Sequence, residues 1–165
     1  MTSQAQQTTA CLSFRIGPET FAASVTQIHE ILELSRITRV PHAPAYMKGV
    51  TNLRGAVLPV IDTRAKFGFP ETEPTPSTSI IVLDIVTAGK TIMLGAMVDE
   101  VIEVFELSLD ALKPLPEFGS KYPTEFVLGM IQKDDTLVMM LDIEKVFTSD
   151  ELIRLQNTNT TEAGI

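Results

Sequence analysis

Runs of alternating apolar and polar residues begin near the N-terminus of this chain. In residues 11–17, Leu12, Phe14 and Ile16 alternate with polar side chains, which is the period-two pattern of a half-buried strand. A Gly-Pro-Glu turn follows, and then a second apolar run at 20–25. The two runs and the turn between them predict a β-hairpin.

The same combination of apolar runs and short turns recurs along the chain. Further hairpins are predicted within residues 49–62, 80–98 and 126–143. Residues 25–34 mix two spacings, which permits either a short helix or a bent strand. Roughly ten short strands at this spacing are typical of an all-β barrel or sandwich.

Helices and loops are predicted to be few. Residues 63–69 suit a short helix that Asp62 caps and that Gly68 ends, and 142–156 suit a C-terminal helical segment. Residues 70–79 contain three prolines among small polar residues, which predicts a hinge or long loop between two halves. Polar residues 1–10 and 157–165 are expected to be disordered.

Length, composition and charge limit the classes of function. The chain has 165 residues, enough for one domain or two small barrels that share a core, and 44% of them are hydrophobic. A net charge of −8 argues against nucleic-acid binding. We find no secretion signal, no apolar run long enough to cross a bilayer, and only Cys11 as a thiol, so no internal disulfide is possible. A cytoplasmic location is therefore expected.

The sequence offers no set of catalytic or metal-binding residues. Asp62-Thr63 resembles the start of an aspartic-protease signature, but Arg64 stands where that loop needs glycine, and no second such motif exists. His29 and His42 lack a second ligand at helical or strand spacing. Phosphate-binding loops and a nucleophile elbow are also missing. We therefore predict a binding protein with no enzymatic activity, no cofactor and no metal.

Residues 48–68, KGVTNLRGAVLPVIDTRAKFG, resemble the signature of the CheW-like domain, the coupling adaptor of bacterial chemosensory arrays. The matching positions are Gly49, Asn52, Leu53, Arg54, Gly55, Pro59, Asp62 and Arg64. The resemblance covers about residues 11–155 and includes Glu30-Ile31 and the run LGAMVDEVIEV at 94–104. The chain departs from the family pattern at FAASV (21–25) and at Thr63, which leaves partner choice open but not the fold.

The resemblance implies two SH3-like five-stranded β-barrels packed on a shared hydrophobic core. We expect the first barrel mainly within 11–68 and the second mainly within 80–141. It also implies an adaptor that bridges the regulatory domain of the chemotaxis histidine kinase and the cytoplasmic tip of a chemoreceptor, and so reaches membrane-bound arrays through protein contacts alone. The sequence leaves open whether such domains also join one another in rings.

Two sets of contact residues follow from the resemblance. The receptor side is expected around Ile28, Glu30, Val50, Asn52 and Arg54, and the kinase side around Gly95, Val98, Asp99 and Val101. The residues themselves allow other roles: an ion pair of Arg54 with Glu30 or Asp62, core packing of the valines, and a bulge at Gly95.

Alternative functions remain at the level of sequence. The same fold could serve a pilus-type or other non-flagellar chemosensory pathway, or could compete for the kinase. A phosphotransfer regulator is disfavoured, because the residues after Gln156 leave no room for a receiver domain.

Overall fold

The computed structural model describes residues 8–87, 89–115, 126–147 and 151. In chain order the elements are β1 (Thr8–Ile16), β2 (Glu19–Ser24), the 3₁₀ turn η2 (Val25–Gln27), β3 (Ile28–Glu33), β4 (Met47–Leu53), β5 (Ala56–Asp62), α1 (Thr63–Phe67), β6 (Ser79–Thr87), β7 (Lys90–Val98), β8 (Glu100–Ser108), η3 (Leu109–Ala111), β9 (Val127–Lys133), β10 (Thr136–Leu141) and α2 (Ile143–Val146). The predicted hairpins are confirmed, and residues 25–34 contain both a helical turn and a strand.

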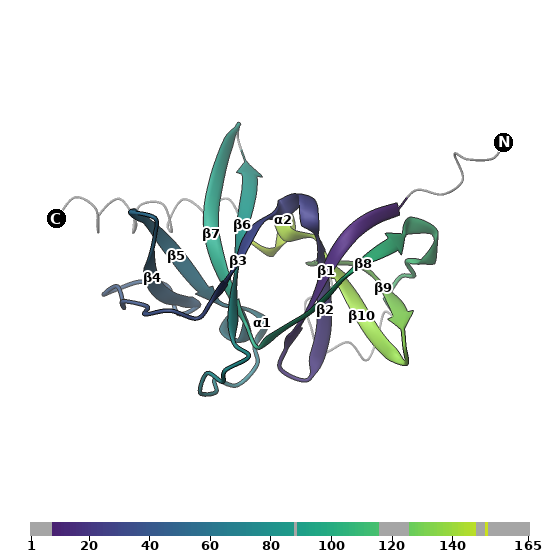
Figure 1. Cartoon of the computed structure of the whole chain (residues 1–165), viewed down its shortest axis with the longest axis horizontal. Coiled ribbons are helices and arrows are strands. Elements are labelled where there is room, and N and C mark those ends of the chain that lie inside the picture. The colour runs from purple at the N-terminus through teal and green to yellow at the C-terminus, as the bar shows by residue number, and fades with distance from the viewer. Residues whose placement is uncertain (1–7, 88, 116–125, 148–150, 152–165) are drawn as a thin grey trace.

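The strands form two five-stranded sheets that lie side by side (Figure 1). Sheet A has the strand order β8-β1-β2-β10-β9, and sheet B has the order β3-β6-β7-β5-β4. The predicted all-β class with two five-stranded units is confirmed. The predicted division at 11–68 and 80–141 is wrong, because sheet A joins both ends of the chain while sheet B is built from its middle.

The chain passes between the sheets at two short connections. The turn η2 leads from β2 in sheet A to β3 in sheet B, and Asp99 alone separates β7 in sheet B from β8 in sheet A. Residues 70–78, by contrast, connect α1 to β6 within sheet B. The predicted hinge at 70–79 is therefore a loop within one sheet, and the single-residue crossover at Asp99 carries the chain back to sheet A.

Each sheet curls until its two edges approach each other. In sheet B, Thr38 follows edge strand β3 and exchanges two backbone hydrogen bonds of 2.8 Å with Val50 of the opposite edge strand β4. In sheet A, Lys113 follows β8 and exchanges bonds of 2.9 and 2.7 Å with Met130 of β9. One bridge of the same kind thus closes each barrel.

The two closures belong to an internal repeat. Gly49 and Gly129 lie at the bridges, and in both cases a Cβ atom would collide with the carbonyl oxygen of the bridging residue, at 2.3 Å from Thr38 and 2.7 Å from Lys113. The same offset in numbering relates β4–β5–α1 to β9–β10–α2. We did not predict this repeat, because most of its equivalent positions hold different residues.

The hydrophobic core lies between the sheets. It includes Phe14 and Phe21 from sheet A and Ile81 and Leu83 from sheet B, and α1 and α2 pack against it. Smaller apolar clusters fill the interior of each barrel. A cavity of about 30 Å³ remains in the shared core, with Ala23 in its lining. A single core therefore joins the two barrels, as the resemblance implied.

Local structure tests the smaller predictions. Asp62 caps α1 by accepting hydrogen bonds from the backbone N–H groups of Arg64 (3.0 Å) and Ala65 (3.5 Å), as predicted. Residues 8–10 were expected to be disordered, which is wrong: they extend β1 and pair with β8. The predicted C-terminal helical segment at 142–156 forms a short helix at 143–146. Residues 148–150 and 152–156 of that segment lie outside the described residues, as do the predicted tails at 1–7 and 157–165.

Candidate functional site

An exposed arginine lies at the free end of sheet B and is held by a carboxylate from the opposite edge strand. Arg54 follows β4, and its guanidinium donates to both oxygens of Glu30 in β3, at 2.6 and 2.7 Å. The Arg54 side chain is 68% exposed, and that of Glu30 is 21% exposed. This bidentate contact is the strong form of an arginine–carboxylate pair, yet it leaves most of the Arg54 side chain accessible to solvent.

The hairpin turn between β4 and β5 sets the position of Arg54. Arg54 and Gly55 have φ values of 52° and 88°, which is the pair of left-handed residues found in a type I′ turn. Glycine suits this conformation, and the Asn52 side chain further holds the turn by accepting from the Gly55 N–H at 2.9 Å. The Asn-Leu-Arg-Gly sequence thus places Arg54 at the tip of the hairpin.

A shallow groove runs beside this hairpin. It has a volume of about 430 Å³. It is lined by Ser35, Arg36, Thr38, Val50, Thr51, Asn52 and Val57. Two valines provide apolar floor, and hydroxyl and amide groups provide its rim. Such a surface can accept a narrow apolar ridge flanked by polar groups.

Electrostatics favour the charged forms of the pair. The hydrogen bond from Arg54 lowers the pKa of Glu30, and the same bond raises the pKa of Arg54. His29 lies next to Glu30, with Nε2 at 3.8 Å from the carboxylate and Nδ1 at 3.1 Å from Asp84. Asp84, His29, Glu30 and Arg54 therefore form a continuous polar row across this end of sheet B.

The predicted receptor-side residues come together at this end of sheet B but do not have equal access. Arg54 and Asn52 are exposed, whereas Val50 is only 6% exposed and packs in the core. Ile28 is half-buried at the start of β3 and also packs against the shared core. A partner could therefore contact Arg54 and Asn52 directly, while Ile28 and Val50 mainly support the surface from below.

The predicted kinase-side residues do not form one exposed surface. Val98 is 1% exposed, and Gly95 is buried in β7, where a Cβ atom would lie 2.7 Å from Ile80 Cγ2. Both positions are buried and offer no side-chain surface to a partner, so a kinase surface around them remains a prediction. Gly95 also lies in a regular ladder with β6 and is not a bulge. Val101 is half-buried at the rim of a groove between the sheets.

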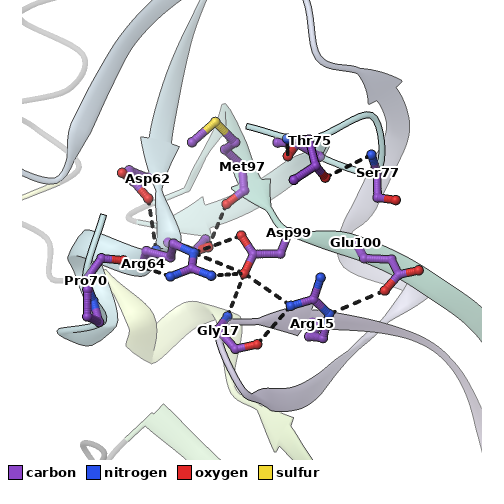
Figure 2. Close-up of polar contacts among 12 residues, drawn as sticks. Arg15, Gly17, Asp62, Arg64, Pro70, Thr75, Ser77, Met97, Asp99 and Glu100 are labelled. Carbon is purple, nitrogen blue, oxygen red and sulfur yellow. Dashed lines mark hydrogen bonds and ion pairs between the residues drawn. The ribbon is translucent and has the colours of Figure 1, made fainter. Parts of the chain in front are cut away.

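Asp99 is held by two other segments of the chain, the end of β1 with its turn and the helix α1 (Figure 2). Its carboxylate accepts from the Gly17 N–H at 2.7 Å and from Arg64 Nε at 3.0 Å, and Arg64 Nη2 lies at 2.8 Å. Arg15 Nη1 approaches to 3.6 Å and also donates to the Gly17 carbonyl at 3.0 Å. Asp99 and Arg64 are each 18% exposed in their side chains, and Arg64 is the main ion-pair partner of Asp99.

Sheet A carries a surface that we did not predict. Seven large apolar residues are exposed in the described chain, and five of them lie in β8, η3, β9 or β10: Ile102, Val104, Leu109, Leu128 and Leu137. Their exposed fractions run from 45% to 62%. In β8, Ile102 and Val104 alternate with Glu103 and Phe105, but this pattern alone does not show which apolar side chains are exposed.

The two ends carry related ion pairs. Lys133, in the turn region of β9, lies 3.4 Å from Glu103 of β8, and thus joins the edge strands of sheet A as Arg54 and Glu30 join those of sheet B. In Figure 1, β4 and β5 lie at one end of the molecule and β9 and β10 at the other. The chain therefore presents two comparable ends, one more polar and one more apolar.

The described part of the chain contains neither a cluster of metal-binding side chains nor a membrane-spanning helix. No group of three or more His, Cys, Asp or Glu side chains there could hold a metal ion. No helix among those residues is long and apolar enough to cross a membrane.

Known proteins resemble the chain over nearly all of its length. The family model of the CheW-like domain matches residues 10–151. The probable chemotaxis protein CheW of Rhizobium etli is 34% identical over 140 residues, which cover 85% of this chain and 88% of that protein. The chemotaxis protein CheW of Klebsiella aerogenes is 33% identical over 146 residues, covering 88% and 86%. A weaker relative, protein PilI of Pseudomonas aeruginosa, is 30% identical over 110 residues, covering 65% and 58%.

A solved structure shows the same fold. The scaffolding protein TtCheW from Thermoanaerobacter tengcongensis superposes with a TM-score of 0.76 at 25% sequence identity, and the match covers 92% of this chain and 95% of that one. Sequence and structure thus lead to one conclusion: the chain belongs to the CheW-like domain family.

Proposed function

We propose that this chain is a non-enzymatic adaptor that couples chemoreceptors to the histidine kinase of a bacterial chemosensory array. The observation that carries the proposal is the match with chemotaxis proteins across residues 10–151. The two ends of the molecule, one more polar and one more apolar, support it, because an adaptor needs separate surfaces for separate partners. In this role the protein works in the cytoplasm and reaches the membrane only through its receptor.

The receptor side lies at the free end of sheet B. Receptor tips of this family of systems are helical bundles, and an apolar ridge of such a helix fits the groove floored by Val50 and Val57. Arg54 stands beside the groove with 68% of its side chain exposed, so it can meet a carboxylate or a helix carbonyl. Glu30 holds the guanidinium in place before binding, which reduces the entropy lost when the contact forms.

The kinase side lies on sheet A. Exposed apolar residues such as Val104 and Leu137 are available there to a protein partner, and interfaces bury such residues at their centres. Val101 is close enough to the surface to take part, whereas Gly95, Val98 and Asp99 act from beneath by fixing β7 and the crossover to β8. The proposed kinase surface therefore lies on strands from the second half of the chain, such as β8 and β10.

Co-sedimentation with purified kinase and receptor-tip fragments tests the proposal. Wild-type protein is expected to recruit kinase to the receptor. Arg54→Asp is expected to bind kinase and lose the receptor, because the exposed charge is reversed while the buried core is untouched. Arg39→Asp makes the same charge change at another exposed position and serves as the control. Wild-type protein that binds neither partner would contradict the proposal.

A second candidate circuit shares the same surfaces. The resemblance to protein PilI favours a test for a non-flagellar pathway, in which the adaptor would serve another receptor and kinase. A tagged chain expressed in its own cell should co-purify with one receptor–kinase set. The identity of that set decides between the circuits, and recovery of kinase without receptor would instead indicate a competitor.

A further inference from the structure

We infer that Asp99 is a positioning residue that clamps the two sheets together and so fixes the relation between the receptor end and the kinase end. Asp99 lies at the point where the chain crosses from one sheet to the other. Asp99 is the only residue between β7 of sheet B and β8 of sheet A, so any movement of one sheet against the other must turn the backbone at this point.

The carboxylate joins elements of both sheets. Arg64 in α1 belongs to the side of sheet B, and it contacts Asp99 through Nε at 3.0 Å and Nη2 at 2.8 Å. Gly17 lies in the turn between β1 and β2 of sheet A and donates its N–H at 2.7 Å. Arg15, in β1, adds a longer contact at 3.6 Å and ties the adjacent Glu100 at 3.3 Å. Figure 2 shows these arms converging on one carboxylate.

Asp99 has little capacity left for a partner. Its Oδ1 accepts from Arg64, and its Oδ2 accepts from Gly17 and lies within reach of both arginines. With 18% of its side chain exposed, the group is mostly shielded from solvent. A carboxylate so occupied is engaged mainly within its own fold, and a new donor would compete with the contacts that Arg64 and Gly17 already make.

The shared core constrains the angle between the sheets through packing, and directional contacts can add to that constraint. Apolar contacts are non-directional, and the core contains a cavity of about 30 Å³ beside α1 and α2. Hydrogen bonds from an arginine guanidinium to a carboxylate, by contrast, require a defined geometry. The clamp therefore adds directional contacts to the packing of the apolar layer, at the edge where the chain crosses.

Spin-label distances test the clamp without any partner. Ala56→Cys and Thr136→Cys place labels at the exposed first residues of β5 in sheet B and β10 in sheet A, in a Cys11→Ser background. We expect Asp99→Asn and Arg64→Met each to broaden or shift the distance distribution between the sheets, while a label pair within sheet B stays unchanged. Arg64→Lys, which keeps the charge but lacks the fork, should give an intermediate result and replaces Arg64→Met if that variant is unstable.

Binding provides the second readout and rests on the proposed function. The two single variants should each weaken the kinase–adaptor–receptor assembly about fivefold, and the double variant should weaken it no further, because both remove one clamp. An unchanged distance distribution would overturn the inference whatever the binding data show. If the inter-sheet distances change in the variants but wild-type protein binds neither kinase nor receptor, the inference about Asp99 is supported and only the proposed function is contradicted.

Discussion

Gly49 and Gly129 hold equivalent places in the two sheets, each directly against the backbone carbonyl of the residue that closes its barrel. A Cβ atom would lie 2.3 Å from Thr38 O at Gly49 and 2.7 Å from Lys113 O at Gly129. Gly49 also has a φ of 153°, which other residues rarely adopt. The closure of both barrels therefore depends on the missing side chain.

Alanine at these two positions should destabilise the fold to different degrees. We expect Gly49→Ala to lower the free energy of unfolding by about 3 kcal/mol, because it adds a backbone clash and a strained φ. Gly129→Ala should cost about 2 kcal/mol, since it adds the clash alone. Urea unfolding of both variants measures the difference. Losses below 0.5 kcal/mol, a threshold typical of surface substitutions, would show that the bridges are not tight.

Filling the cavity in the shared core should stabilise the protein. Ala23 lines that cavity, and Ala23→Val adds two methyl groups where space of about 30 Å³ exists. We expect a gain of about 1 kcal/mol in the free energy of unfolding. Its neighbour Ala22 faces the filled interior of sheet A with 0% exposure, so Ala22→Val should destabilise. Equal effects from the two changes in thermal unfolding would contradict the placement of the cavity.

The two helix caps of the internal repeat should differ in strength. The Asp62 side chain accepts two backbone hydrogen bonds at the start of α1, whereas Asp142 makes no such bond at the start of α2. Asp62→Ala should therefore cost about 1 kcal/mol of stability, and Asp142→Ala less than about half of that. Chemical denaturation distinguishes them, and a larger loss at Asp142 would count against the described capping.

The Asp99 clamp should make stability depend on acid pH. Burial raises the pKa of Asp99, but the hydrogen bonds from Arg64 and Gly17 and the charges of Arg64 and Arg15 together bring it below the ordinary value of 3.8. A folded-state pKa below the unfolded one stabilises the protein at pH values above the ordinary value, and this stabilisation is lost as pH falls through the folded-state pKa.

Comparison of wild type with Asp99→Asn isolates this contribution. The stability difference between them should be full near neutral pH and should shrink as the pH falls below about 4. Thermal unfolding across this range provides the measurement. A difference that stayed constant into strong acid would mean that the Asp99 charge contributes nothing to the fold.

Much of the fold follows from local sequence. Alternation predicted the hairpins because each strand buries one face, and Asp62 predicted the start of α1 because a side-chain oxygen satisfies free N–H groups. The pairing of β1 with β8 could not be predicted, because hydrophobic pattern identifies strands but not their partners across the chain. This is why the two barrels were assigned to the wrong segments.

The functional site was predictable in part for a similar reason. The sequence allows an ion pair of Arg54 with Glu30, and the structure joins them, yet only the curl of sheet B brings those edge strands together. The departure at Thr63 has a structural explanation: its hydroxyl donates to the Met97 carbonyl at 2.6 Å. The sequence could not show whether Asp99 and Val98 contact a partner or contact other residues of this chain, because their burial depends on the packing of both sheets.

Reciprocal loss of binding tests the central claim, that the two ends serve two partners. We would measure the affinities of the kinase regulatory domain and of the receptor tip for Arg54→Asp and Val104→Asp, with folding verified by thermal unfolding. The account predicts that Arg54→Asp loses the receptor tip and keeps the kinase domain, and that Val104→Asp does the opposite. Loss of both partners in either folded variant, or of the same partner in both, would contradict the division into two surfaces.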